Sequence, residues 1–361
     1  MERGQIYYGS VDASPLFVML LAEAYRWGAP IDRIRPLLPA ARAALEWCRH
    51  DAVMVAGVNR GPFVWYTPDP NGLGNQGWKD SGDCMVHADG SLAVGSLAVA
   101  EAQAYVYEAL IGLARLERDL GQGAVVADAL VAEARLLSIA FVEHFSVGDD
   151  GLIALALDEA GAPLCVASSN MGQCLWSGIV PSHLASRVAA RTIAADLCTP
   201  WGIRTLGANE KAYNPLGYHL GTVWAHDTAI IAAGLARHGH DSGFRALKDG
   251  LLSAAEQFDW RLPELYGGMD TTADGAPLPY PAACSPQAWS AGAPLLLLRS
   301  ALGLDPDIPA GTVRVSPMLG DGQTLCVRGI RLGGESGQIS VDGDGVVTTE
   351  GYHGVEFTNV G

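Results

Sequence analysis

Apolar residues recur at helical spacing along most of the chain, up to about residue 302. This spacing is typical of amphipathic helices. Ser14 and Pro15 mark the start of the first helix, because serine caps a helix N-terminus and proline fits the first turn. The pattern predicts helices at about 15–27, 36–49, 92–118, 124–146, 182–197, 221–238, 243–258 and 286–302, whereas residues 147–180 follow no single period.

The character of the chain changes after residue 302, where short runs alternate apolar and polar residues. Such alternation predicts β-strands. We therefore expect a helical domain at residues 1–302 and a small β-rich domain at 303–361. Within the helical part, short links alternate with long loops that are rich in aromatic residues. This organisation predicts an all-α fold, an α/α toroid in which helix pairs surround a central axis.

Composition and charge narrow the possible partners. The chain has 361 residues, 49% of them hydrophobic and 17% charged, as expected for a globular protein with a sizeable core. Its net charge of −16 argues against nucleic acid and anionic membranes, because both bind basic surfaces. A neutral oligo- or polysaccharide fits this charge. No apolar run is long enough to span a membrane, and we expect a cytoplasmic protein.

Two loop carboxylates are the main candidates for chemistry. Asp80 lies in NQGWKDSGD, at the end of a loop rich in glycine, proline and asparagine, and Glu264 lies in LPELYGG. Such a pair can hydrolyse a glycosidic bond, because one carboxyl group protonates the leaving oxygen and the other activates water. The alternatives are a turn or N-cap role for Asp80 and a solvated loop position for Glu264.

Polar and aromatic residues of other loops could complete a sugar pocket, because aromatic rings offer flat apolar faces and a polar edge. The candidates are Trp78, His219, Trp224, His226, Asp227 and Trp289. Core packing is the alternative for each aromatic residue. No third ligand accompanies His226 and Asp227 at a useful spacing, and the seven cysteines show no CxxC spacing, so we expect no metal site.

Two further positions are open to more than one interpretation. Arg204, in WGIRTL, could donate hydrogen bonds to sugar hydroxyls or form a structural ion pair. Tyr8 and Asp12, in YYGSVDASP, directly precede the first predicted helix. We expect both of them on the same rim as Asp80.

The chain resembles, over essentially its whole length, the catalytic domain of bacterial amylo-α-1,6-glucosidase-like proteins, which are relatives of the glucosidase part of glycogen debranching enzyme. The resemblance rests on YYGSVDASPLFV, NQGWKDSGD, EAQAYVYEAL, WGIRTL, YNPLGYHLGTVWAHD, LPELYGG and PQAWSAGA, in this order. It implies an (α/α)6 barrel and inverting hydrolysis of an α-linked glucosyl residue, with no cofactor.

The resemblance also implies roles for individual residues. The WxDS motif of the family falls on residues 78–81 and makes Asp80 the general acid, and its PE motif makes Glu264 the general base. Lys79 and Gln287 then belong to the glucose pocket. For an inverting enzyme, the two carboxyl groups are expected about 6.5–9.5 Å apart.

This sequence departs from the family in two ways. Ala225 stands where relatives have proline, and the YYGSVDA motif begins at Tyr7, whereas relatives carry a β domain and several helices before it. We therefore expect an incomplete ring of helices with an exposed apolar flank near the first helix, and self-association through that flank. The alternatives are a non-catalytic carbohydrate-binding protein of the same fold and a trehalase-like or rhamnosidase-like glycosidase.

Overall fold

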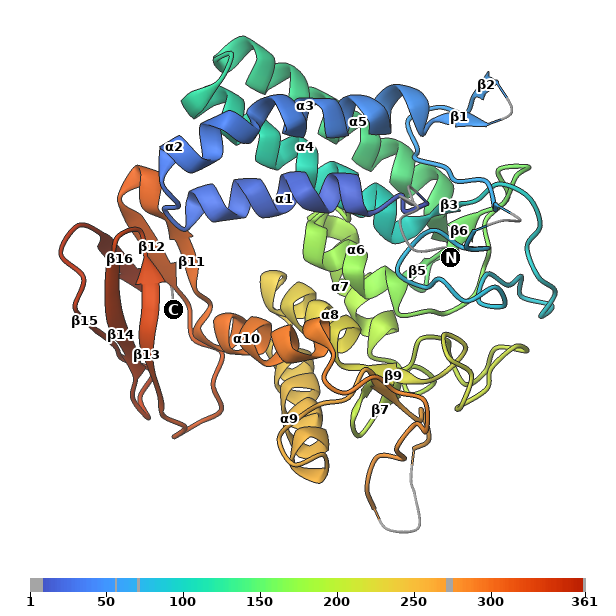
Figure 1. Cartoon of the computed structure of the whole chain (residues 1–361). Helices are drawn as coiled ribbons and strands as arrows, with labels where there is room; N and C mark the ends of the chain where they lie inside the picture. The colour runs from blue at the N-terminus through green and yellow to red at the C-terminus, as the bar shows by residue number, and fades with distance from the viewer. Residues whose placement is uncertain (1–8, 56, 70–71, 271–274, 360–361) are drawn as a thin grey trace.

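The structure is a computed structural model that describes residues 9–55, 57–69, 72–270 and 275–359, and it is rich in helices (Figure 1). The α-helices are α1 (Ala13–Arg26), α2 (Ile31–Ile34), α3 (Leu38–Glu46), α4 (Ala100–Leu120), α5 (Ala124–Phe145), α6 (Asn170–Ser177), α7 (Ser182–Thr192), α8 (Ala225–Arg237), α9 (Asp241–Gln257) and α10 (Ala288–Leu302). No helix of this described part combines the length and the apolar character that a membrane span requires.

Five of these helices pack side by side in the order α1, α4, α6, α8 and α10, and we call them the central helices. Each of the first four also packs against an outer helix, so that α3, α5, α7 and α9 cover α1, α4, α6 and α8. Glycines allow the central helices to approach closely. A β-carbon on Gly112 of α4 would lie 2.7 Å from Ala22 of α1, and one on Gly172 of α6 would lie 2.5 Å from Ile231 of α8.

The predicted helix at 92–118 is partly wrong, because α4 begins only at Ala100. The apolar residues Leu92 and Val94 are exposed, so they do not belong to a buried helical face. Leu97 pairs with Tyr66 in an extended bridge, and β3 (Ala98–Val99) pairs with β6 (Ala156–Leu157). The unassigned region 147–180 contains short strands followed by α6.

Short antiparallel strand pairs connect the loops around the helix ends. These strands are β1 (Met54–Val55), β2 (Val58–Asn59), β4 (Ser146–Val147), β5 (Leu152–Ile153), β7 (Cys198–Thr199), β8 (Gly202–Ile203), β9 (Val223–Trp224) and β10 (Leu265–Tyr266). The pairing of β9 with β10 is important for function, because Trp224 lies opposite Leu265 and thereby beside Glu264.

The C-terminal part contains two three-stranded sheets, with strand orders β11-β12-β16 and β13-β14-β15. Their bounds are β11 (Asp305–Asp307), β12 (Thr312–Val315), β13 (Leu325–Leu332), β14 (Glu335–Val341), β15 (Val347–Glu350) and β16 (Glu356–Asn359). The sheets enclose an apolar cluster that includes Val313, Leu332 and Ile339. Figure 1 shows these strands on one side of the helices and the long loops on the other side.

The central helices all begin on the side of the long loops. Asp12 precedes α1, and Glu101, Asn170 and His226 lie in the first turns of α4, α6 and α8. Gln287 caps α10, where its side chain accepts a hydrogen bond from the amide of Trp289. The fold therefore gathers polar residues from distant parts of the sequence at one end of the helices.

Candidate active site

The loop that carries Asp80 is fixed on both sides of this residue. The Lys79 side chain is buried and donates hydrogen bonds to the Asn170 side chain and, at 2.7 Å, to the Thr205 carbonyl. On the other side, the Ser81 hydroxyl lies 2.9 Å from His219 Nδ1. Asp80 itself is half-buried between these two anchors. Its carboxyl group is thus held at the loop surface.

Glu264 comes from the segment between α9 and β10 and is 7% exposed. Its Oε1 accepts a hydrogen bond of 2.9 Å from the Tyr218 hydroxyl, and its Oε2 accepts one of 3.0 Å from the Cys284 amide. The Glu264 amide in turn donates to the Cys284 carbonyl. A carboxylate with one donor on each oxygen has a fixed orientation.

The charges of these two carboxyl groups interact although 184 positions separate them in the sequence. Partial burial raises the pKa of Asp80 above its ordinary value, and the negative charge of Glu264 raises it further, against the effect of a backbone hydrogen bond. Burial also raises the pKa of Asp12, with a smaller contribution from the charge of Asp80. Asp12, Asp80 and Glu264 therefore share one electrostatic environment, in which Asp80 is the more readily protonated member of the expected catalytic pair.

Aromatic and imidazole rings form a compact cluster beside this acid pair. Trp78 lies edge-on to Trp224, His219 and His226, with ring centroids 5.0–5.7 Å away. His219 stacks on Trp224 at 4.9 Å, and His226 stacks on Trp289 at 3.9 Å. The cluster combines flat faces with polar edges.

Both histidines of the cluster are neutral at pH 7. Burial lowers the pKa of His219 to about 2 and that of His226 to about 3, and the nearby Lys79 charge contributes to both shifts. His219 Nδ1 faces the Ser81 amide at 3.4 Å as an acceptor, so its hydrogen resides on Nε2. Within the described residues, His219 Nε2, both His226 ring nitrogens and Trp78 Nε1 are buried without a hydrogen-bond partner.

A buried polar network lies behind the cluster. Asn170 links Lys79 to Glu101, and Gln173 links Tyr105 to Asp227. Burial lowers the pKa of Lys79, while the negative charges of Asp227 and Glu101 oppose this shift. Lys79 and Asp227, both expected to contact the sugar, are thus fully buried members of this network. They support the loop and α8 from behind.

Arg204 also differs from its expected sugar-binding role. Its guanidinium group is 1% exposed and donates to the carbonyl groups of Ala195, Asp196, Cys198 and Gly268. It also pairs with the Asp270 carboxylate at 2.5 Å. Because its donors are occupied within the protein, Arg204 is a structural group that joins the loop before β7 to the segment after β10.

The remaining expected positions have mixed outcomes. Trp289 is 39% exposed and stacked beside the pocket, whereas the Trp224 indole is buried and donates to the Tyr218 carbonyl at 3.0 Å. Gln287 caps α10. Tyr8 lies outside the described residues. No group of three or more histidine, cysteine, aspartate or glutamate side chains in the described ranges is arranged to hold a metal ion.

Sequence reasoning missed Tyr218 and the Cys284 amide, the two donors that hold Glu264. Tyr218 lies next to His219 in the aromatic segment, so the segment itself was recognised. Nothing in the local pattern indicates which of its hydroxyl groups reaches the base, because that depends on the pairing of β9 with β10. A backbone donor leaves no sequence signal at all.

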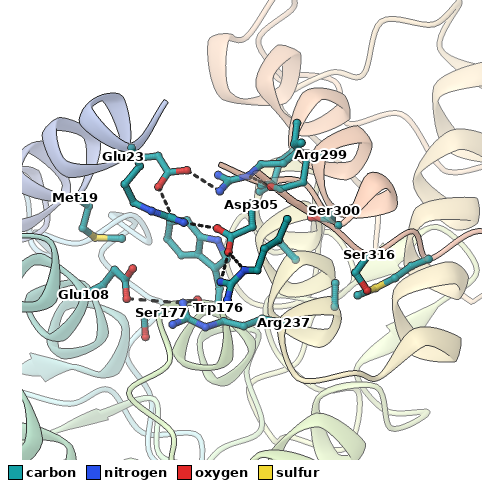
Figure 2. Close-up of a pocket in the computed structure, with 18 of the residues that line it drawn as sticks. Met19, Glu23, Glu108, Trp176, Ser177, Arg237, Arg299, Ser300, Asp305 and Ser316 are labelled. Atoms are coloured by element: carbon teal, nitrogen blue, oxygen red, sulfur yellow. Dashed lines mark hydrogen bonds and ion pairs between the residues drawn. The ribbon is translucent and has the colours of Figure 1, made fainter. Parts of the chain in front are cut away.

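A separate cavity of about 730 Å³ lies at the other ends of the central helices (Figure 2). Its lining includes Arg26, Arg237 and Arg299, which lie in the last turns of α1, α8 and α10, and none of the expected catalytic residues. Figure 2 shows Glu23 linked to Arg299 and Glu108 linked to Arg237 across this space. Its arginines are paired with carboxylates of the same cavity, which distinguishes it from the Asp80–Glu264 site.

Solved structures share the fold at low sequence identity. A sialidase has a TM-score of 0.71 at 12% identity, with 94% of this chain and 31% of that chain covered. The GH63 mannosylglycerate hydrolase from Thermus thermophilus, in complex with glucose, has a TM-score of 0.59 at 17% identity, with 82% and 78% covered. For a GH78 rhamnosidase of Bacillus sp. GL1 the values are 0.63, 14%, 97% and 33%. The chain thus spans about a third of the sialidase and of the rhamnosidase.

A family model gives the class of the protein. No curated protein matches the chain. The model of the mannosylglycerate hydrolase MGH1-like glycoside hydrolase domain matches residues 74–275, which is more than half of the sequence and includes both Asp80 and Glu264. The expected glycosidase class is confirmed at this level, whereas the amylo-α-1,6-glucosidase specificity goes beyond the match. The chain belongs to the family of MGH1-like glycoside hydrolase domains.

Proposed function

We propose that the protein is an inverting glycoside hydrolase that releases a terminal α-linked glucosyl residue. Asp80 donates its proton to the glycosidic oxygen as the bond from C1 to that oxygen breaks. Glu264 accepts a proton from a water molecule whose oxygen attacks C1 from the opposite face. Asp80 ends as a carboxylate and Glu264 as a carboxylic acid, and proton exchange with solvent restores the starting state.

The electrostatic coupling between Asp80 and Glu264 is the observation that carries this proposal. A general acid must hold its proton near neutral pH, and both burial and the Glu264 charge raise the pKa of Asp80 in that direction. A general base must be charged and oriented, and Tyr218 and the Cys284 amide hold the Glu264 carboxylate. The two groups therefore differ in the direction that their roles require.

Unpartnered polar atoms beside this pair support a sugar as the ligand. A buried polar atom without a hydrogen bond costs roughly 1–3 kcal/mol, so such atoms in a native protein call for a partner. Trp78 and His219 offer N–H donors, and neutral His226 offers one donor and one acceptor. Sugar hydroxyl groups can both donate and accept, and therefore match this mixture.

A second candidate is the hydrolysis of an α-mannoside. The description of the matching family model and the name of one structural neighbour both refer to mannosylglycerate hydrolase. The acid–base pair is the same for both sugars, so the ring contacts decide between them. The trehalase-like, rhamnosidase-like and binding-only alternatives differ from these candidates in substrate or in turnover.

Hydrolysis of aryl α-glucosides and aryl α-mannosides by the purified protein tests the proposal. We expect turnover of the glucoside, and loss of about 100-fold or more in Asp80→Asn and in Glu264→Gln, with sugar binding by calorimetry retained. Asp83→Asn, which changes an exposed neighbour, is the matched control and should keep full activity. Preference for the mannoside favours the second candidate, and binding without turnover favours the binding-only protein.

A further inference from the structure

Two of the nine tryptophans are exposed, and both lie near the proposed base. All nine fall within the described residues. Trp289 is 39% exposed and stacks on His226, whereas Trp260 is 69% exposed. The residues that follow Trp260 and Arg261 are buried, from Leu262 onward to Glu264. The exposure of Trp260 is thus confined to the turn and does not reflect loose packing of the whole segment.

The backbone at this turn is unusual. Asp259 and Trp260 have φ angles of 52° and 61°, and they are the only non-glycine residues of the described chain with positive φ. The turn ends α9, where the Trp260 amide donates to the Ala255 carbonyl at 2.7 Å. Glycine is the usual residue at such a position, because a β-carbon is disfavoured in the left-handed region. An exposed tryptophan here stabilises the fold neither by burial nor by its backbone.

The turn is close to the proposed cleavage point. Four residues can span at most about 14 Å, so this length limits the distance between the Cα atoms of Trp260 and Glu264. The helices α8 and α9 pack together and are joined by only His238–His240, so they run antiparallel. The end of α9 therefore lies toward the beginning of α8, which carries His226.

We propose that Trp260 is a stacking platform for a neutral oligosaccharide that extends from the Asp80–Glu264 site. This inference rests on the proposed function and adds a preference for chains longer than two sugar units. An indole ring presents a broad apolar face with a polar edge, which suits the C–H face of a pyranose ring. No charge on the ligand is required, in keeping with the net charge of −16. Trp289 contacts the units near the cleavage point, and Trp260 contacts units farther along the chain.

Calorimetric titration with linear α-gluco- and α-manno-oligosaccharides of two and six units tests this preference. We expect the wild-type protein to bind the longer chain of one series about tenfold more tightly than the shorter chain, corresponding to the contribution of one additional stacked ring. Trp260→Gly should lose this gain, and Trp260→Tyr should retain most of it. Asp259→Gly is the matched control, because it relieves the same backbone conformation and keeps the indole, and it should bind like the wild type.

Thermal unfolding separates this role from a structural one. Both glycine variants should unfold at the wild-type temperature or up to about 3 °C higher, because the left-handed conformation suits glycine. A chain-length gain that survives in Trp260→Gly overturns the inference, and so does a wild-type protein without such a gain in either series. Turnover of aryl α-glycosides, which are too short to reach Trp260, should be unchanged in Trp260→Gly. Absent turnover with an intact chain-length gain instead contradicts the proposed function alone.

Discussion

At the scale of single residues, consecutive positions of the site have different tasks. Lys79 points into the buried network, Asp80 faces the site, and Ser81 contacts His219. The sequence indicated the acidic residue and the aromatic company, because residue type alone suggests that chemistry. It could not distinguish a side chain that supports the loop from one that faces the substrate, because that depends on which segments meet behind the loop.

Removal of the Tyr218 hydroxyl should slow catalysis with little effect on substrate binding. Tyr218→Phe keeps the ring contacts with His219 and Trp224 but removes one of the two donors that orient Glu264. We expect kcat to fall about tenfold with KM nearly unchanged, because the lost interaction orients the base. Steady-state kinetics measures the split. Tyr213→Phe is the control, since that hydroxyl donates to the Gly268 carbonyl, and an equal loss there would contradict the assignment.

The raised pKa of Asp80 has a consequence for stability. A carboxyl group whose folded-state pKa lies above the unfolded value near 3.8 favours folding below that value and loses this contribution as pH rises through the folded pKa. Asp80→Asn should therefore unfold at a higher temperature than the wild type at pH 7, and this difference should shrink toward pH 4. Melting curves across this range measure the effect. A pH-independent difference would show that Asp80 has an ordinary pKa.

At the scale of elements, the prediction succeeded where packing follows local periodicity. The helix expected at 124–146 corresponds to α5 (Ala124–Phe145). It failed where long-range pairing overrides periodicity, as at residues 92–99, which belong to loop pairings with Tyr66 and β6. Arg204 is a similar case, because four carbonyl groups converge on it only after distant loops have met.

Arg204 should contribute to stability far more than to sugar binding. Arg204→Met leaves several buried carbonyl groups without donors, and we expect a loss of roughly 3 kcal/mol in the free energy of unfolding. Urea denaturation gives this value. Arg187→Met, at an exposed arginine, is the control and should be nearly neutral. A fully stable Arg204→Met protein with weakened sugar affinity would restore the sugar-binding interpretation.

At the scale of the whole molecule, the central helices end in two helices with exposed apolar side chains. Leu20 of α1 is 70% exposed and Leu295 of α10 is 69% exposed, and both helices line the cavity of about 730 Å³ (Figure 2). The helix α10 is apolar over most of its surface, which is typical of a helix covered on all sides. This is the apolar flank that the sequence led us to expect near the first helix.

We expect the protein to self-associate through this flank. Leu20→Lys combined with Leu295→Lys should shift the protein toward the monomer, because charges oppose burial of the flank in a second copy. Size-exclusion chromatography with light scattering measures the mass. Leu136→Lys on α5 changes an equally exposed leucine, 66% exposed, away from the flank and should leave the mass unchanged. A wild-type monomer at all accessible concentrations would contradict this expectation.

The stereochemistry of the first product tests the central claim most directly. A proton-donating Asp80 and a water-activating Glu264 on opposite faces of the sugar require inversion at C1. Proton NMR during hydrolysis of an aryl α-glucoside should therefore show β-glucose first, with α-glucose appearing only as the anomers equilibrate. Initial appearance of α-glucose would mean retention, and would contradict the assignment of Glu264 as the base that activates water.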